Sequence, residues 1–214
     1  MLLLLLAAPS FGRTCVSALV SETARPLDLH PTQLYVGHRE AEVKRDKLLQ
    51  MSERQRELYL LGKALPVVRG PGGRLYLIDG HHLALAAHWA DIAEIPVVIL
   101  NDWSHVGNRR FWRKMVRAGY VYLRHSNGSA VDPSQLGQDV TDCEDDEYRS
   151  LAYFVRKLKG YKKKKRPYSE FIWANFFRFR VPLDQMDFDA AVRLAVQVAH
   201  SPDAKHLPGY QPAP

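Results

Sequence analysis

The residues best suited to chemistry form one short segment, Asp79-Gly80-His81-His82. Neighbouring imidazoles can bind phosphate, transfer protons or hold a metal near neutral pH. The segment separates an apolar run at residues 75–78 from an alanine- and leucine-rich stretch that predicts a helix beginning at His81. A strand that turns directly into a helix leaves backbone N–H groups free for an anion. We therefore predict a phosphate-binding turn at Gly80, His81 and His82, in which His81 or His82 is a phosphate ligand or a catalytic acid and Asp79 acts in catalysis or caps the helix.

The spacing of the histidines argues against a metal site. Two histidines on one face of a helix stand at positions i and i+4, whereas His81 and His82 are adjacent and point about 100° apart. The two cysteines, Cys15 and Cys143, are too few for a cysteine-rich zinc site or a disulfide framework. We predict no protein-held metal, with a structural zinc as the weaker alternative, and expect Mg²⁺ only as the companion of a nucleotide.

The elements around the turn predict a compact α+β core over residues 26–104. Strands are expected at residues 34–36, 65–69, 75–78 and 95–100, and helices at 40–51, 53–61 and 81–91. The run Gly70-Pro-Gly-Gly73 is typical of a turn, so the second and third strands should form a hairpin. The third helix is long enough for a right-handed parallel crossover to the last strand.

Residues 105–200 are predicted to form a mostly helical region. Helices are expected at residues 109–118, 148–159, 168–178 and 187–200. An acidic stretch at residues 139–147 contains six carboxylates. The proline-rich tail at residues 201–214 is expected to be loosely ordered.

Residues 1–25 are interpreted as a leader or a disordered tail. Their apolar start has the length of a signal-peptide core, but no basic residue precedes it, and it is too short to span a bilayer. These features favour a cytoplasmic protein without stable membrane insertion, and export remains the alternative.

The charge of the chain favours polyanionic partners. Its formal net charge is +7 and its sequence pI is about 9.4. Two basic groups of residues are expected to bind a nucleic-acid backbone. The first is the run Lys162, Lys163, Lys164, Lys165 and Arg166, and the second is the helix face with Arg110, Arg113 and Arg117. The alternative interpretation is that these charges are simply solvated.

The ordered set of segments resembles the ParB/sulfiredoxin superfamily. The Asp79–His82 turn is similar to the Asp-Gly-His-His form of ParB-like free serine kinases, and the chain from about residue 27 to 180 most closely resembles the ParB-like nucleases. The resemblance is carried by Pro31-Thr-Gln33, Pro66-Val-Val68, the Gly70–Gly73 turn and the segment from Glu170 to Arg178. It implies a small mixed sheet with helices and a helical C-terminal extension.

The resemblance also implies roles for residues near the first long helix. Glu40 is similar to the helix-start glutamate of the serine kinases and is expected to be the general base, with Glu42 as second choice. Leu83 occupies the position where superfamily members that bind nucleoside triphosphates usually have arginine, so a phosphate clamp would come from Lys44, Arg39 or the backbone. His81 stands where sulfiredoxin has its catalytic cysteine, and Cys143 lies among carboxylates that raise a thiol pKa. Sulfinic acid reduction is therefore rejected.

Two functions remain open at this point. The first is phosphoester hydrolysis or phosphoryl transfer with a nucleotide or nucleic acid as substrate. The second is a non-catalytic nucleic-acid-binding or accessory module with the same fold.

Overall fold

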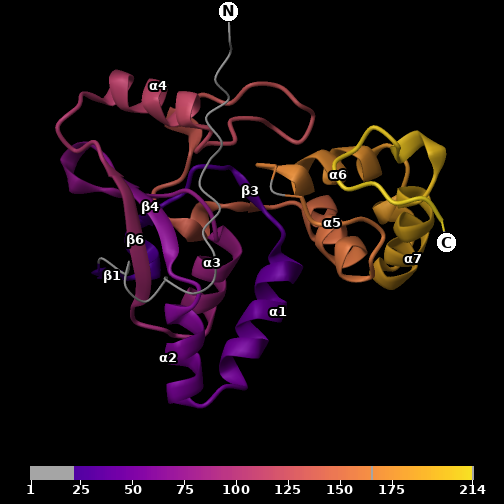
Figure 1. Ribbon diagram of the computed structural model, residues 1–214, viewed down its shortest axis with the longest axis horizontal. Coiled ribbons are helices and arrows are strands. Elements are labelled where there is room, and N and C mark those ends of the chain that lie inside the picture. The colour runs from indigo at the N-terminus through magenta and orange to yellow at the C-terminus, as the bar shows by residue number, and fades with distance from the viewer. Residues whose placement is uncertain (1–21, 165, 214) are drawn as a thin grey trace, which may run out of the picture.

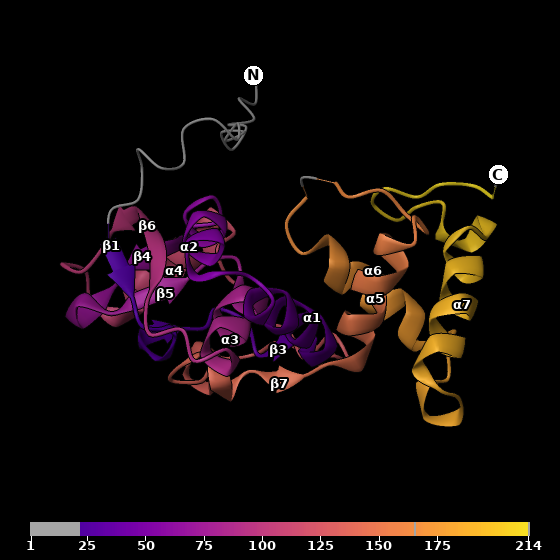
Figure 2. The same cartoon turned by 90° about the horizontal axis from the view of Figure 1, so that it is seen from below.

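The computed structural model describes residues 22–164 and 166–213, which form an α+β core and a C-terminal helical unit (Figure 1). Seen from below, helices α5, α6 and α7 group at one end of the molecule, and the sheet lies at the other (Figure 2). Most of the leader expected at residues 1–25 lies outside the described residues, but the prediction is wrong for Glu22–Ala24, which form strand β1 of the sheet. Within the described part of the chain, no helix is both long and apolar enough to cross a membrane.

The core is built on a mixed five-stranded sheet with the order β1-β6-β4-β5-β2. The strands are β1 (Glu22–Ala24), β2 (Leu29–His30), β4 (Leu65–Arg69), β5 (Leu75–Leu77) and β6 (Ile95–Asp102). β4 and β5 form the predicted antiparallel hairpin, and β6 runs parallel to β4. β5 and β6, which α3 connects, are therefore antiparallel to each other, so the expected parallel crossover through this helix is wrong; the parallel neighbour of β6 is β4.

Helix α3 (His81–Trp89) is the central helix of the core. Every residue from His81 to Ala87 is buried, as expected for a helix that is apolar on all sides. Its Leu83, Ala84 and Ala87 pack in one cluster with Val67 and Val97 of the sheet. Helix α1 (His38–Leu49) packs beside α3, and α2 (Glu53–Leu61) follows, with a capping box formed by Ser52 and Gln55.

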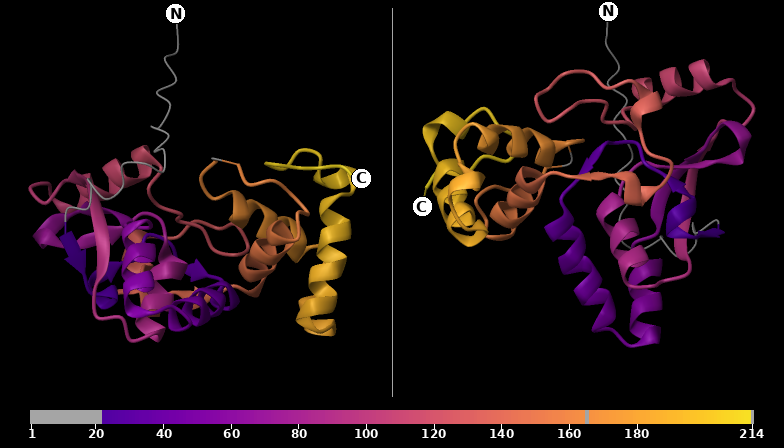
Figure 3. Two further views of the ribbon diagram at one scale, coloured as in Figure 1. Left: turned by 60° about the horizontal axis from the view of Figure 1, so that its bottom comes forward. Right: turned by 180° about the vertical axis from the view of Figure 1, so that it is seen from behind.

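The C-terminal unit has its own hydrophobic core. It contains α5 (Glu147–Lys157), α6 (Ser169–Arg178) and α7 (Phe188–Ala199). Trp173 is fully buried at its centre and stacks on Tyr161 with ring centroids 4.2 Å apart. From behind, the helices of this unit lie beside the core rather than over its sheet (Figure 3). Helix α4 (Asn108–Ala118) lies at the other side, against the sheet hairpin.

A short parallel ladder joins the core to the helical unit. Strand β3 (Tyr35–Val36) pairs with β7 (Glu144–Asp145), directly before α1 and α5, respectively. Carboxylates of the acidic stretch serve here as caps: Asp145 accepts from the His38 N–H, and Asp146 accepts from the Tyr148 N–H. Gly37 then passes so close to Ser150 that a Cβ atom would lie 2.6 Å from its backbone nitrogen.

The prediction of a loosely ordered tail is wrong for residues 202–210. Ala204 and Leu207 are buried in the helical unit, and the Trp173 indole N–H donates to the Pro208 carbonyl at 2.9 Å. The Lys162 N–H donates to the Gly209 carbonyl at 2.8 Å, beside the bridge between Tyr161 and Tyr210. Buried apolar side chains and these hydrogen bonds outweigh the effect of the proline content.

The tail contact predicts a large effect of Gly209→Ala. Gly209 has a φ of +79°, and a Cβ atom there would overlap the Lys162 carbonyl. Gly128 is the matched control, because it has a φ of +85° but nothing within 4 Å of an added Cβ atom. We expect Gly209→Ala to lower the free energy of unfolding by about 2 kcal/mol more than Gly128→Ala in urea titrations. Equal losses would contradict the packing described here.

Candidate functional site

The Asp79–His82 turn has the geometry predicted from its sequence. β5 ends at Leu77, Gly80 adopts a φ of +90°, and α3 begins at His81. A side chain at Gly80 would also overlap Leu65. Asp79 Oδ1 accepts a hydrogen bond from the adjacent Gly80 N–H at 2.7 Å, and Asp79 remains exposed. The N-cap of α3 is Gly80 and no side chain caps this helix, so the expected capping of the helix by Asp79 is wrong.

Both histidines are buried and hold the backbone of the neighbouring segment. His81 Nε2 accepts from the Thr32 N–H at 3.2 Å, and His82 Nε2 accepts from the Gly37 N–H at 3.0 Å. Burial lowers the pKa of each to about 3, so both are neutral near pH 7. An Nε2 that accepts a hydrogen bond requires the remaining proton on Nδ1.

Glu40 faces the turn from α1 and is the centre of a buried ionic cluster. Its Oε1 accepts from Lys44 Nζ at 2.7 Å, and its Oε2 lies 3.1 Å from Arg149 Nη1 and 3.4 Å from His82 Nε2. Burial acts to raise the pKa of Glu40, but the positive charges of Arg149 and Lys44 outweigh burial and hold the pKa well below its usual range. Glu40 is thus ionised, and in the free protein it is a weak base.

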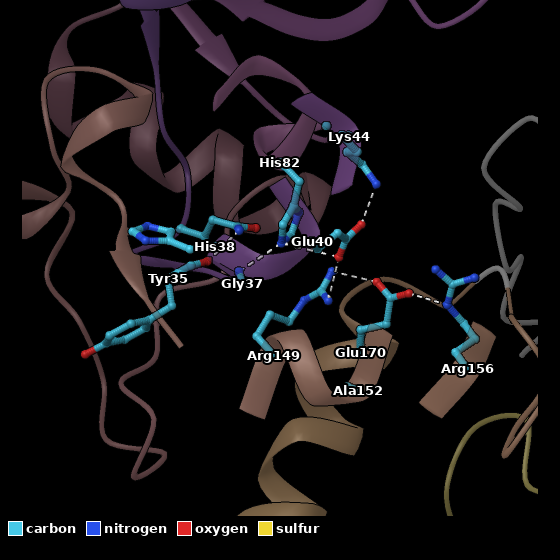
Figure 4. Close-up of polar contacts among 12 residues, drawn as sticks. Tyr35, Gly37, His38, Glu40, Lys44, His82, Arg149, Ala152, Arg156 and Glu170 are labelled. Atoms are coloured by element: carbon cyan, nitrogen blue, oxygen red, sulfur yellow. Dashed lines mark hydrogen bonds and ion pairs between the residues drawn. The ribbon is translucent and has the colours of Figure 1, made fainter. Parts of the chain in front are cut away.

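Arg149 extends this cluster into the helical unit. Its Nη2 lies 2.7 Å from Glu170 Oε2, and Arg156 Nε lies 2.5 Å from Glu170 Oε1. Figure 4 shows the resulting chain of ion pairs, from Lys44 through Glu40, Arg149 and Glu170 to Arg156. Burial acts to lower the pKa of Arg149, but the two carboxylates raise it overall. Arg149 Nε is buried without a hydrogen-bond partner among the described residues.

The turn and the ionic cluster line one cleft between the core and the helical unit. Two cavities, of about 440 Å³ and 550 Å³, share six lining residues. The shared residues are Asp79, His82, Arg149, Arg156, Lys163 and Glu170. The larger cavity continues along Lys44, Lys47, Lys63 and Lys157, and the smaller one along Tyr120, Tyr168 and Phe171. The cleft therefore has a basic end and an aromatic end, which meet at the turn.

Most of the predicted site residues reach this cleft. Those that line it are Glu40, Lys44, Asp79, Gly80, His81, His82, Lys163, Lys164 and Arg166. Arg149, Arg156 and Glu170 line it as well, although sequence reasoning assigned them no role. The available signal was the spacing of Arg149, Tyr153 and Arg156, which places them on one face of α5.

Other predicted site residues lie elsewhere. Arg39 pairs with Glu147 at 3.5 Å and stacks over Phe188 at 4.3 Å, because Glu40 takes the inner face of α1 and its neighbour points about 100° away. Arg39 therefore does not form the expected phosphate clamp beside the turn. Lys162 borders a separate hollow beside the C-terminal tail. Lys165 falls outside the described residues.

The basic face of α4 is also separate from the cleft. Arg110, Arg113 and Arg117 are exposed, and none of them lines either cavity. The end of α4 reaches the rim of the aromatic end through Ala118 and Gly119. The nucleic-acid role assigned to the three arginines stays a prediction.

Metal and thiol chemistry have little support in the described residues. No group of three or more His, Cys, Asp or Glu side chains there is placed to hold a metal ion. Cys143 is buried, and its burial, assisted by Asp142 and Asp139, raises the pKa of the thiol to about 12. The carboxylates that were expected to raise this pKa thus contribute less than burial does, and the thiol stays protonated at neutral pH.

Comparison with known proteins identifies the family. The family model described as "Putative ParB-like nuclease" matches residues 24–179, which include the turn, Glu40 and Arg149. The chain belongs to this family. The crystal structure of protein Atu1540 from Agrobacterium tumefaciens is similar, with a TM-score of 0.83 and 34% sequence identity over 90% of this chain and 97% of that one. No curated protein matches. The resemblance to the ParB-like family and the α+β fold are thereby confirmed.

The buried cluster predicts that Arg149→Met strongly destabilises this ParB-like protein. Removal of one partner from a buried ion pair leaves uncompensated charge, here on Glu40 and Glu170, and costs about 3–5 kcal/mol. Arg45→Met is the control, because Arg45 pairs with Asp46 at the surface and should contribute less than about 1 kcal/mol. Urea titration measures both changes. Similar losses in the two variants would contradict a special role for Arg149.

The two neutral histidines predict a loss of stability in acid. Histidine in the unfolded chain has a pKa of 6.5, whereas His81 and His82 have values of about 3 in the folded protein. Between these values the unfolded chain binds more protons, so the free energy of unfolding falls as pH falls. The slope should reach at most about 2.7 kcal/mol per pH unit, or about 1.36 for each histidine.

Urea titrations from pH 7 to pH 5 measure this slope. His82→Gln should remove about half of it, because glutamine can accept the same Gly37 hydrogen bond but does not titrate. A variant with the slope of the unaltered protein would show that His82 does not remain neutral.

Proposed function

We propose that the protein acts on phosphoester groups of a nucleotide or nucleic acid held in the cleft, by hydrolysis or phosphoryl transfer. The observation that carries this proposal is the convergence of the α3 N-terminus and several basic side chains on one cavity. Such an arrangement attracts phosphate through both backbone N–H groups and positive charge. Membership in a family described as ParB-like nucleases supports nucleic acid as the partner.

In this proposal, a phosphate lies over the first turn of α3. The His81 and His82 N–H groups point toward it from the helix N-terminus, and Lys44 and Arg156 neutralise its charge. The histidine side chains position the turn, since their Nε2 atoms already accept backbone hydrogen bonds. With pKa values of about 3, they do not serve as general acids at neutral pH.

Two carboxylates are candidates for the general base. Asp79 is the exposed one and lines both cavities. Glu40 is the base expected from the family resemblance, and its ion pairs keep it ionised but weakly basic. A substrate phosphate that draws Lys44 away from Glu40 raises the pKa of Glu40 toward its usual range, which makes it a better base when substrate is bound.

The donor set at the turn does not fit a metal held by the protein alone. Magnesium prefers octahedral oxygen ligands, and Glu40 and Glu170 already take part in ion pairs. Asp79 can supply one ligand to a Mg²⁺ ion that arrives on the phosphates of a nucleotide. The ion would then neutralise phosphate charge.

A non-catalytic nucleic-acid-binding module is the second candidate. It is favoured because the side chains best suited to catalysis already have structural contacts: both histidines are buried, and Glu40 is ion-paired. Such a module would bind nucleic acid in the same cleft and release it unchanged.

Turnover assays on site variants separate these two functions. The substrates are ATP, ADP, CTP, single-stranded DNA and double-stranded DNA, each with Mg²⁺. We expect Asp79→Asn to lower kcat by about 10²–10⁴-fold with little change in KM, as for loss of a general base. Lys44→Gln should raise KM, because it removes a phosphate contact. Lys205→Gln is the control, since Lys205 is exposed on the tail and lines neither cavity.

The outcome assigns the function. Turnover that is unchanged in both cleft variants would refute the proposed site. Binding of nucleic acid by the unaltered protein without turnover of any substrate would support the non-catalytic module instead.

A further inference from the structure

Helices α1 and α5 form the two walls of the basic end of the cleft. On α1, Glu40, Lys44 and Lys47 follow one another at spacings of four and three residues, so they share a face. On α5, the matching face carries Arg149 and Lys157. The two faces begin at the buried Glu40–Arg149 ion pair and end at the exposed Lys47 and Lys157.

Two tyrosine rings lie close to the lysine ammonium groups at the basic end of the cleft. Lys47 Nζ lies 4.6 Å and Lys63 Nζ 5.4 Å from the ring centroid of Tyr59. Lys44 Nζ lies 5.0 Å and Lys157 Nζ 5.5 Å from the ring centroid of Tyr153. The negative face of an aromatic ring attracts ammonium groups, so the rings gather positive charges that would otherwise repel one another.

The carboxylates of the cleft leave the outer positive charges uncompensated. Glu40 pairs with Lys44 and Arg149, and Glu170 pairs with Arg149 and Arg156. Within the described part of the chain, neither Lys47 nor Lys157 makes an ion pair with a carboxylate. This end of the cleft therefore lacks negative charge that a bound anion could supply.

We propose that this basic end binds a run of linked phosphates, with Lys47 and Lys157 as ligand contacts. This inference deepens the proposed function and depends on phosphate binding in the same cleft. The first phosphate lies at the α3 turn beside Lys44, and the following ones continue along α1. From Glu40 to Lys47 the helix rises about 10 Å, which is long enough to face more than one linked phosphate.

The shared chemistry has two sources, the polyphosphate of a nucleotide and the backbone of a nucleic acid. Binding of orthophosphate, tripolyphosphate and a fluorescein-labelled single-stranded oligonucleotide is measured over a range of salt concentrations. The test variant is Lys47→Gln/Lys157→Gln, and the control is Arg54→Gln/Lys205→Gln, whose residues are exposed and line neither cavity.

We expect the test variant to bind tripolyphosphate, the oligonucleotide or both at least tenfold more weakly. The slope of log affinity against log salt should fall by about 2, or about one for each lost phosphate contact. Orthophosphate binding and the thermal unfolding midpoint should not change, and the control should behave as the unaltered protein does. Loss for tripolyphosphate alone indicates a nucleotide, and loss for the oligonucleotide indicates a nucleic-acid backbone.

Different results would contradict this inference and the proposed function. If the test variant keeps full affinity while Lys44→Gln loses it, the linked-phosphate site is refuted and the turn remains a phosphate site. If the unaltered protein binds none of the probes, or binds poly-glutamate as tightly as tripolyphosphate, the inference also fails. If tripolyphosphate binds through Lys47 and Lys157 but no substrate is turned over, the catalytic proposal fails and this inference stands.

Discussion

The ion pairs of Arg149 with Glu40 and Glu170 are the contact on which the rest of the site depends. They connect α1 of the core with α5 and α6 of the helical unit, and they define the floor of the cleft. Burial of charge is expensive unless every member of a cluster is paired. The alternation of acidic and basic groups from Lys44 to Arg156 meets this condition and leaves one net positive charge. The two hydrophobic cores pack separately, so the units are held together by contacts such as this cluster, the β3–β7 ladder and the stacking of Tyr122 on Phe171.

The histidines belong to the same constraint. His81 and His82 each accept a backbone N–H from the segment between β2 and α1, which carries Gly37 toward α5. Their burial keeps both imidazoles neutral near pH 7, and their hydrogen bonds fix the turn to the neighbouring segment. The function of the Asp-Gly-His-His segment is therefore divided. The backbone and Asp79 face the cleft, whereas the imidazoles hold the neighbouring chain in place.

Local sequence patterns predicted the longer strands and the helices, because such signals depend on neighbours in the chain, but they did not predict the short strands β1, β2 and β7. The hairpin around Gly70–Gly73, helix Glu53–Leu61 and the turn at Gly80 follow from residue types over a few positions. The pairing of Glu40 with Arg149 cannot be predicted in this way, because the two residues lie 109 positions apart in the sequence. From sequence alone, each could equally be a charge on the solvated surface. Arg39 illustrates the same limit: one position along α1 decides whether a side chain enters the cleft or stacks on Phe188. The C-terminal tail illustrates the same limit, because its composition does not reveal that Leu207 packs into the hydrophobic core of the helical unit.

In the proposed function, the coupling of charges within the cleft would link substrate binding to reactivity. In the free protein, Lys44 contacts both Glu40 and the ring of Tyr153, so it lies between the buried cluster and the basic end. An anion at this end competes with Glu40 for Lys44, which weakens the interaction that holds the pKa of Glu40 down. Arg149 stays with Glu40 because it is buried and also held by Glu170. The carboxylate thus keeps its position while its basicity rises. In the proposed function, a phosphate beside Lys44 would therefore prepare the site for chemistry through the same lysine that binds it, whereas an anion bound only at Lys47 and Lys157 would not.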